Sequence, residues 1–347
     1  MIVLIKVYSN YWSDVVIHQQ YLKQEVEIID DLGSFAIAKF TLREFKLQKY
    51  NKVEIYEAGN PDRLIFKGYV EDIKKTATIL DEVGEVVCWD GKGLLQRRGP
   101  LYGYNEVSTP MNIVVSKMMD HRNEIGDNWV YQVDYSTPID MEYDLGTTCY
   151  NILQELADQV QGYWTVKDNK IIISTMVGED KTMGSNEIKL FFDGTNASNV
   201  KEVIETQTEN RANVAIGIGN DGGKLMVYDL EDYPYGVVID NFQTGQLTEK
   251  TNSLLDRNNV DKRSIGVVLD ENMNYNVNIG DKVNLQVEGL KTIEDFVGEV
   301  FVLRKTITYR FGKKYEVVEV GNSSAVVGDL SSLIKNINDK VDKIRNK

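Results

Sequence analysis

The sequence has 347 residues, which is enough for two or three domains and too many for one ordinary hydrophobic core. Its net charge of −14 disfavours a broad surface that binds nucleic-acid phosphates. Two histidines (His18 and His121) and two widely separated cysteines (Cys88 and Cys149) disfavour histidine-based metal sites, histidine triads and CxxC chemistry.

The first 98 residues predict a domain of short β-strands. Alternating apolar and polar residues, with turn signals such as Asp30-Asp31-Leu32-Gly33 between them, indicate a β-barrel or sandwich. The expected strands cover residues 2–5, 25–29, 35–42, 52–57, 64–75 and 85–89.

Residues 99–187 predict a smaller α+β domain inserted in the β-structure. Thr109-Pro110 is typical of a helix start, and an apolar stripe follows it from Met111 to Met119. A second helix is expected after Thr147 or Thr148 and should stop at Gly162. A hairpin should then cover 163–174, and residues 188–325 return to strands as a second β-domain.

One segment of the sequence occurs twice, 230 residues apart. The shared pattern F-x-G-x-V-x-x-[IL]-[KR]-K-T-x-T begins at Phe66 and again at Phe296. Two amphipathic strands can look alike by chance, but this match keeps its register over three successive segments. It also includes a glycine that alternation does not require. We interpret it as a duplicated barrel motif, with these matched residues: Phe66, Gly68, Val70, Phe296, Gly298 and Val300.

Residues 326–347 predict a C-terminal helix with a narrow apolar seam. Apolar residues recur at spacings of three and four, and β-branched residues at both seam positions favour three or four helices over two. The alternative is an amphipathic helix that packs on its own domain. The seam consists of Val327, Leu330, Ile334, Ile337, Val341 and Ile344.

Several motifs that resemble catalytic or cofactor sites have simpler readings. Gly217-x-Gly219-x-x-Gly222 fits a dinucleotide fingerprint, but an alternating, strand-like stretch follows it where that site needs a helix. Paired carboxylates such as Asp30-Asp31 are expected to be solvated turn residues, because neighbours in a strand or turn point apart. The pairs Glu231-Asp232 and Asp270-Glu271 have the same reading, and the tyrosines of Tyr233-Pro234-Tyr235 are expected to be structural rather than sugar-binding. Both cysteines are expected to be buried thiols. No cofactor or metal is expected.

Taken together, these segments resemble the tail-hub proteins of tailed bacteriophages. The resemblance rests on residues 62–73, 88–98, 152–156, 162–168, 280–283, 296–310 and 319–321, and it covers most of residues 1–325. It implies a mainly β fold with two similar tube-like β-barrels, at 1–98 and 188–325, a smaller α+β insertion at 99–187 and a C-terminal coiled-coil helix at 326–347. It also implies a homotrimer that forms a pseudo-sixfold ring, since each chain supplies two barrels.

The resemblance further implies a structural role at the distal end of a virion tail. The expected partners are a tail tube or distal tail protein ring, a central spike or fibre protein and a tape-measure protein. DNA is expected to contact the ring only while it passes through the channel. No membrane segment is expected, because no run of 18 apolar residues occurs. The chain is too short to add an attached lysozyme or peptidase domain, so an enzyme is not expected. The alternatives are a carbohydrate- or receptor-binding tail module and, more weakly, a peptidoglycan hydrolase or peptidase.

Overall fold

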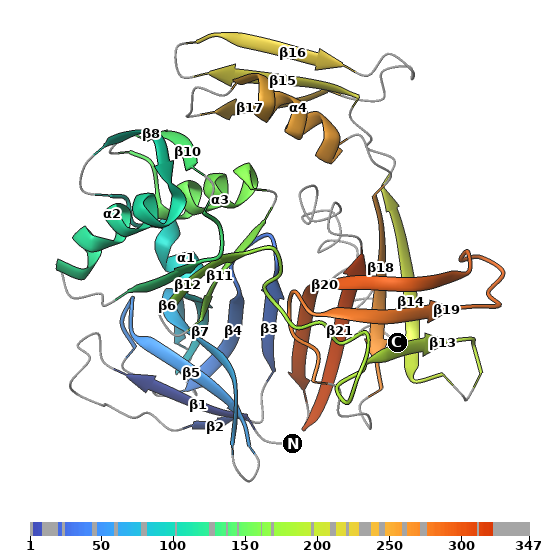
Figure 1. The fold of residues 1–347 in the computed structure, drawn as a ribbon. Helices are drawn as coiled ribbons and strands as arrows, with labels where there is room; N and C mark the ends of the chain where they lie inside the picture. The colour runs from blue at the N-terminus through green and yellow to red at the C-terminus, as the bar shows by residue number, and fades with distance from the viewer. Residues whose placement is uncertain are drawn as a thin grey trace.

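The structure is a computed structural model in which strands far outnumber helices (Figure 1). It describes residues 3–8, 20–22, 25–43, 47–58, 62–77, 82–100, 103–124, 129–136, 138–143, 146–160, 162–167, 170–195, 198–208, 213–219, 222–228, 237–242, 247–258, 262–270, 276–310 and 312–321. The mainly β fold class with a smaller α+β part is therefore confirmed. The C-terminal seam lies outside the described residues.

The N-terminal β-region is an antiparallel array in the neighbour order β3-β4-β7-β6-β5-β1-β2. Its side chains alternate between buried and partly exposed, as at residues 65–70 of β6, because one face of the array covers a core. The strands are β1 (Val3–Tyr8), β2 (Gln20–Leu22), β3 (Val26–Asp31), β4 (Ile37–Arg43), β5 (Lys52–Glu57), β6 (Arg63–Ala77) and β7 (Glu82–Trp89).

The middle region is a small α+β unit with its own core. Thr148 accepts a hydrogen bond from the Asn151 amide and so caps α3, one of the two positions that the sequence offered. The predicted hairpin is present as β11 and β12, and β9 adds to it in parallel. The elements are α1 (Gly91–Gln96), β8 (Tyr104–Pro110), α2 (Met111–Glu124), β9 (Val130–Val133), β10 (Pro138–Tyr143), α3 (Cys149–Gln159), β11 (Tyr163–Lys167) and β12 (Lys170–Ser174).

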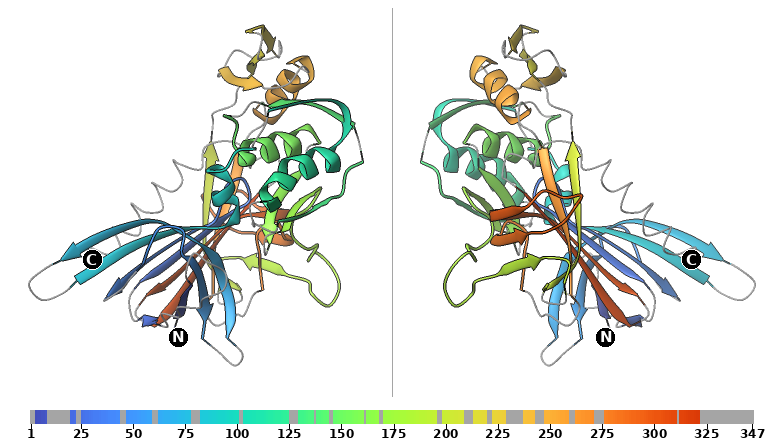
Figure 2. Two further views of the ribbon diagram at one scale, coloured as in Figure 1. Left: turned by 90° about the vertical axis from the view of Figure 1, so that its left-hand side faces the viewer. Right: turned by 90° about the vertical axis from the view of Figure 1, so that its right-hand side faces the viewer.

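The C-terminal region contains a second antiparallel array and a separate small unit. The array is built from β13 (Lys189–Phe192), β14 (Val200–Thr208), β18 (Lys262–Leu269), β19 (Lys282–Val287), β20 (Phe296–Arg310) and β21 (Lys313–Gly321). Between β14 and β18 the chain forms a three-stranded sheet covered by one helix: β15 (Val214–Gly219), β16 (Lys224–Tyr228), β17 (Val237–Phe242) and α4 (Leu247–Asn258). Figures 1 and 2 show this unit at one end of the molecule.

The two β-arrays are joined directly by hydrogen bonds. The second half of β20 pairs antiparallel with β3, from Arg304–Asp31 to Tyr309–Val26, while its first half pairs with β19. The result is one 13-stranded sheet that includes strands from both regions. This direct pairing of the two β-arrays was not anticipated from the sequence, which predicts two separate β-domains.

Three clusters of buried side chains correspond to the three regions. The first contains residues between Val3 and Cys88 together with Ile307 and Tyr309 of β20, the second lies between Leu94 and Ile173, and the third between Leu190 and Val320. Helix α1 contributes Leu94 and Leu95 to the middle core. The predicted domain limits at 98 and 187 stay predictions.

Candidate site at the junction of the three regions

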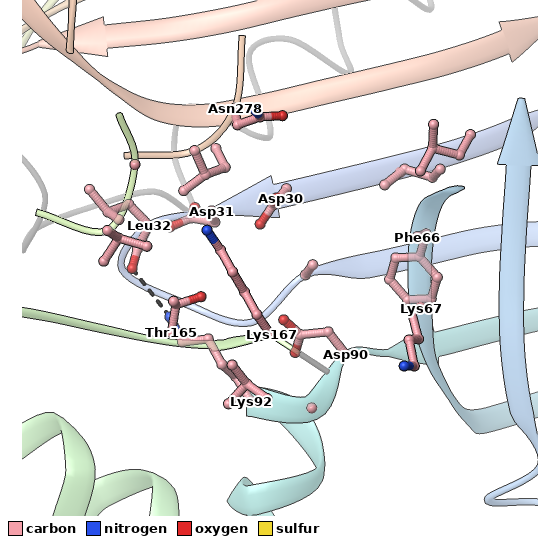
Figure 3. Close-up of a pocket in the computed structure, with 18 of the residues that line it drawn as sticks. Asp30, Asp31, Leu32, Phe66, Lys67, Asp90, Lys92, Thr165, Lys167 and Asn278 are labelled. Carbon is pink, nitrogen blue, oxygen red and sulfur yellow. Dashed lines mark hydrogen bonds between the residues drawn. The ribbon is translucent and has the colours of Figure 1, made fainter. Parts of the chain in front are cut away.

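A cavity of about 570 Å³ lies where the two β-arrays and the α+β unit meet (Figure 3). Its walls come from the end of β3, the start of β6, the start of α1, strand β11, and two segments at 177–179 and 278–281. The charged and amide side chains in its lining are Asp30, Asp31, Lys67, Asp90, Lys92, Lys167, Glu179, Asn278 and Asp281.

The acidic pair at the end of β3 faces the interior of the junction. Asp31 is 8% exposed, and its carboxylate accepts a hydrogen bond of 2.8 Å from the Gly33 amide. The expectation that Asp30-Asp31 is a solvated turn is therefore wrong. The physical reason is the pairing of β3 with β20, because it covers the turn with strands of the second β-array.

Helix α1 places a capping carboxylate and a buried amine beside that acidic pair. Asp90 caps the helix by accepting the Gly93 amide at 3.0 Å. Lys92 is only 4% exposed, donates to the Leu32 carbonyl at 3.3 Å, and lies 4.8 Å from the centre of the Trp164 ring. Lys92 thus links the α+β unit to the end of β3 through both polar and aromatic contacts.

The electrostatics of this cluster are dominated by loss of water. Burial raises the pKa of Asp30 and of Asp31, and it raises the pKa of Asp90 to about 6. Burial also lowers the pKa of Lys92, while the three nearby carboxylates act in the opposite direction. The charges therefore compensate one another only in part, as expected for ionisable groups taken out of water.

A second set of charged residues lies where β20 pairs with β3 and β21. Arg304 of β20 is paired in register with Asp31 of β3 on one side and with Glu319 of β21 on the other. These three residues are all at most 8% exposed. On the neighbouring position, Lys305 donates to the Val277 carbonyl and lies 2.8 Å from Glu316. The backbone hydrogen bonds between β3 and β20 thus place the positive charge of Arg304 near Asp31, where it acts against the rise in the pKa of Asp31 that burial causes.

The duplicated motif lies on the two longest strands, β6 and β20, each of 15 residues. Both strands have a register shift, between Val70 and Asp72 in β6 and between Val302 and Arg304 in β20. The two shifts are 232 residues apart, whereas the repeat aligns the strands at 230. The pairing with the preceding strand also differs by two residues. Gly68 pairs with Val53, whereas Gly298 pairs with Leu285 and not with Val283, which lies 230 residues after Val53. The duplication as such stays a prediction.

The other sequence predictions have mixed outcomes. Gly217 and Gly219 lie in β15, and the strand β16 follows in place of a helix, so the hairpin interpretation is confirmed. Both cysteines are free and buried, as predicted. Glu231-Asp232 and Tyr233-Pro234-Tyr235 lie outside the described residues. Within the part that the structure describes, no cluster of histidine, cysteine and carboxylates could hold a metal ion.

Sequence reasoning missed Asp90, Lys92 and Arg304. Lys92 stands between two glycines, which is typical of a loop, and the sequence around Arg304 does not indicate that a strand of the first β-region pairs with it. The contact between positions 31 and 304 exists only once the two β-arrays pair. No helix in the described residues is long and apolar enough to span a membrane.

Known proteins resemble this chain in structure and not in sequence. No protein-family model matches the chain, and no curated protein sequence matches it significantly. A tail protein from Neisseria meningitidis MC58 aligns over 93% of this chain and 99% of its own, with a TM-score of 0.68 and 10% identity. The 43 kDa tail protein of prophage MuSo2 from Shewanella oneidensis aligns over 94% and 99%, with a TM-score of 0.64 and 12% identity.

A third similar structure comes from a secretion machine. It is an E. coli component of the type VI secretion system, described as similar to the T4 bacteriophage tail proteins gp27 and gp5. It aligns over 91% of this chain and 76% of its own, with a TM-score of 0.56 and 12% identity. At these identities the likeness concerns the fold, and it extends over nearly the whole chain. The chain therefore has the fold of phage and prophage tail proteins, in agreement with the resemblance seen in its sequence.

Proposed function

We propose that this protein is a structural subunit of a phage-type tail hub, located at the distal end of the virion tail. The observation that carries the proposal is the fold match along nearly the full length of two tail proteins. A match of this extent leaves no large unmatched part of the chain in which to place a separate catalytic domain. The proposed role is to connect subunits and not to catalyse a reaction.

We propose further that three copies form a ring with pseudo-sixfold symmetry. Each chain contains two β-arrays with one long, register-shifted strand apiece, β6 and β20, and each long strand pairs with a shorter preceding strand. Three such chains would place six similar arrays around one axis. A closed ring of this kind suits a partner of sixfold symmetry on one side and of threefold symmetry on the other.

The proposed partners follow from this position. They are the tail tube or distal tail protein ring, a central spike or fibre protein, and the tape-measure protein. DNA would contact the ring only in passage. The net charge of −14 per chain supports a channel that does not hold phosphate, because like charges repel.

The test is the solution mass of the full-length protein. We expect light scattering at micromolar concentration to give the mass of three chains. Addition of the cognate tail-tube protein should give a larger complex of defined size. A monomer that stays monomeric with the tube protein would contradict the proposal. Binding on a glycan array would favour a receptor-binding module instead, and clearing in a zymogram would favour a hydrolase.

A further inference from the structure

The small unit of β15, β16, β17 and α4 has one covered face and one apolar face that is open. Cross-strand pairing puts Val214, Tyr228 and Val237 in one row across the sheet. Ile216, Met226 and Ile239 form a second row two residues along each strand, so the two rows lie on the same face. Residues in one row share a face of the sheet. This face is called the open sheet face below.

Helix α4 covers the other side of the sheet. The alternate row contains Ala215, which is fully buried, and α4 packs against β15, β16 and β17. Thr251 and Leu255 of α4 are themselves buried. Among the residues that the structure describes, a helix covers only one side of this sheet.

The open sheet face is unusually apolar for a surface. Met226, Tyr228, Val237 and Ile239 are 58%, 52%, 56% and 60% exposed. A sheet normally buries its apolar face against a second layer, and clustered exposed apolar residues mark contact surfaces. Six apolar side chains in two rows form a platform about three strands wide, which is suited to one helix.

The start of the C-terminal segment lies beside the root of this unit. Gly321, the last residue of β21, pairs with Ser264 near the start of β18. The same end of β18 pairs with the end of β14, where Lys262 faces Thr208. The chain enters the small unit after Thr208 and leaves it just before Lys262. Residues 322–347 thus begin within a few residues of both connections to the small unit.

The sequence of that segment fits the open sheet face. Its seam residues, from Val327 to Ile344, recur at spacings of three and four, which places them on one side of a helix. The 26 residues from 322 to 347 would extend about 39 Å as a helix, at about 1.5 Å per residue. The segment also carries five Lys or Arg against three Asp, so it is basic on a chain whose total charge is −14.

We propose that the C-terminal segment 322–347 docks through its apolar seam on the open sheet face formed by β15, β16 and β17. The small unit then has a helix on each side of its sheet. The contact can form within one chain or between neighbouring copies. In the second case it links the copies head to tail, and for that consequence the inference rests on the proposed trimer.

The first test is photo-crosslinking in the full-length protein. Benzoylphenylalanine in place of Ile239 on the open sheet face should give adducts that map to residues 327–344. The matched control places it at Val297, which is 69% exposed on β20, and should give no such adducts. A mixture of isotopically light and heavy protein separates adducts within one chain from adducts between copies, and both support docking. Adducts at Ile239 that map elsewhere, or none, would overturn it.

The second test is hydrogen exchange in two complementary variants. Ile239→Lys should accelerate exchange of the 327–344 amides by about tenfold or more, since the segment loses its platform. Ile334→Asp should increase exchange in β16 and β17 even if the first variant disturbs the small unit. Val107→Lys, at a 72% exposed position on β8, is the control and should change neither region. Tail amides that stay protected in Ile239→Lys would show that the seam packs on other copies of itself.

The two proposals fail separately. A trimer by light scattering without the Ile239 adducts would remove the docking contact and keep the ring. A monomer with adducts within one chain would keep the docking contact and remove the ring.

Discussion

At the scale of single residues, the junction depends on a buried amine surrounded by carboxylates. Lys92 is almost inaccessible to water, yet it faces Asp30, Asp31 and Asp90. Removing one partner of a buried ionic cluster leaves the others uncompensated, which typically costs about 3–5 kcal/mol. An exposed pair such as Lys39–Glu27, at 3.1 Å with Lys39 about half exposed, contributes far less.

We therefore predict that Lys92→Met lowers the free energy of unfolding by about 3 kcal/mol at pH 8. The loss should be smaller at pH 5, because the carboxylates left without Lys92 can take up protons. The matched control Lys39→Met should change stability by less than about 0.5 kcal/mol. Urea titration of all three proteins measures this, and equal losses in the two variants would refute the role of Lys92.

Asp90 should make the stability of the folded protein depend on pH. Its pKa in the folded protein is about 6, above the ordinary value of 3.8, so the folded state binds a proton that the unfolded state releases. The contribution of this group to stability is thus present at about pH 4 and is lost as the pH rises through 6. Asn at this position keeps the helix cap, since its side-chain oxygen can still accept the Gly93 amide.

Asp90→Asn should therefore gain stability relative to the wild type as the pH rises from 4.5 to 7.5. Asp90→Ala also lacks the titration, but it loses the cap and should be less stable than Asp90→Asn by about 1 kcal/mol at both pH values. Denaturation at the two pH values measures both effects. A wild type whose stability relative to Asp90→Asn does not change with pH would contradict the buried environment of Asp90.

At the scale of elements, β6 and β20 are similar in length and register shift but differ in how closely their glycines are packed. A Cβ on Gly68 would overlap the Trp89 carbonyl oxygen and the Phe66 ring. A Cβ on Gly298 would approach only the end of the Phe296 ring, at 3.3 Å. A backbone carbonyl in a sheet cannot move aside, whereas a ring at the strand surface can.

Gly68→Ala is therefore expected to cost more than about 1 kcal/mol, and Gly298→Ala less than about 0.5 kcal/mol. Thermal or urea unfolding of the two variants measures the difference. Equal costs would mean that the two glycines have the same surroundings, contrary to the structure. The comparison also tests whether the two copies of the motif have diverged in packing while keeping their strand pattern.

Elements with strong local signals could be predicted from the sequence. β5 occupies residues 52–57 as predicted, because alternation and an adjacent turn define it locally. The apolar stripe of α2 and the cap and apolar stripe of α3 similarly define those helices. The predicted start of α2 at Thr109-Pro110 is wrong, because both residues belong to β8 and the helix begins at Met111. Helix α4 was missed, because its sequence is polar apart from a few leucines and lies in a region that otherwise reads as strands.

The candidate site could not be predicted, because its residues meet only in the folded protein. Asp31 and Arg304 are 273 positions apart, and their proximity follows from the pairing of β3 with β20. A turn signal such as Asp30-Asp31-Leu32-Gly33 describes the local chain and contains no information on what covers it. Long-range strand pairing is the step that sequence patterns specify least.

At the scale of the whole molecule, assembly is the property that matters for the proposed role. The seam residues Ile334 and Ile337 are apolar in an otherwise polar segment. If the seam docks on the open sheet face of a neighbouring copy, replacing both with Asp should weaken trimer formation, as measured by light scattering, and leave the near-ultraviolet circular dichroism of the β-regions unchanged, since a charge is costly in an apolar contact. Substituting Lys340 and Lys343 with Glu, outside the seam, is the control. A double Asp variant that assembles like the wild type would exclude the seam from the interface.

The central claim is that this chain builds a ring. Negative-stain electron microscopy of the purified full-length protein tests it most directly, because a ring is visible without knowledge of any partner. We predict class averages of a ring with threefold symmetry and six similar peripheral densities around a central opening. Averages that show only single, asymmetric particles of one chain, under conditions where the tail-tube protein is also present, would contradict the account.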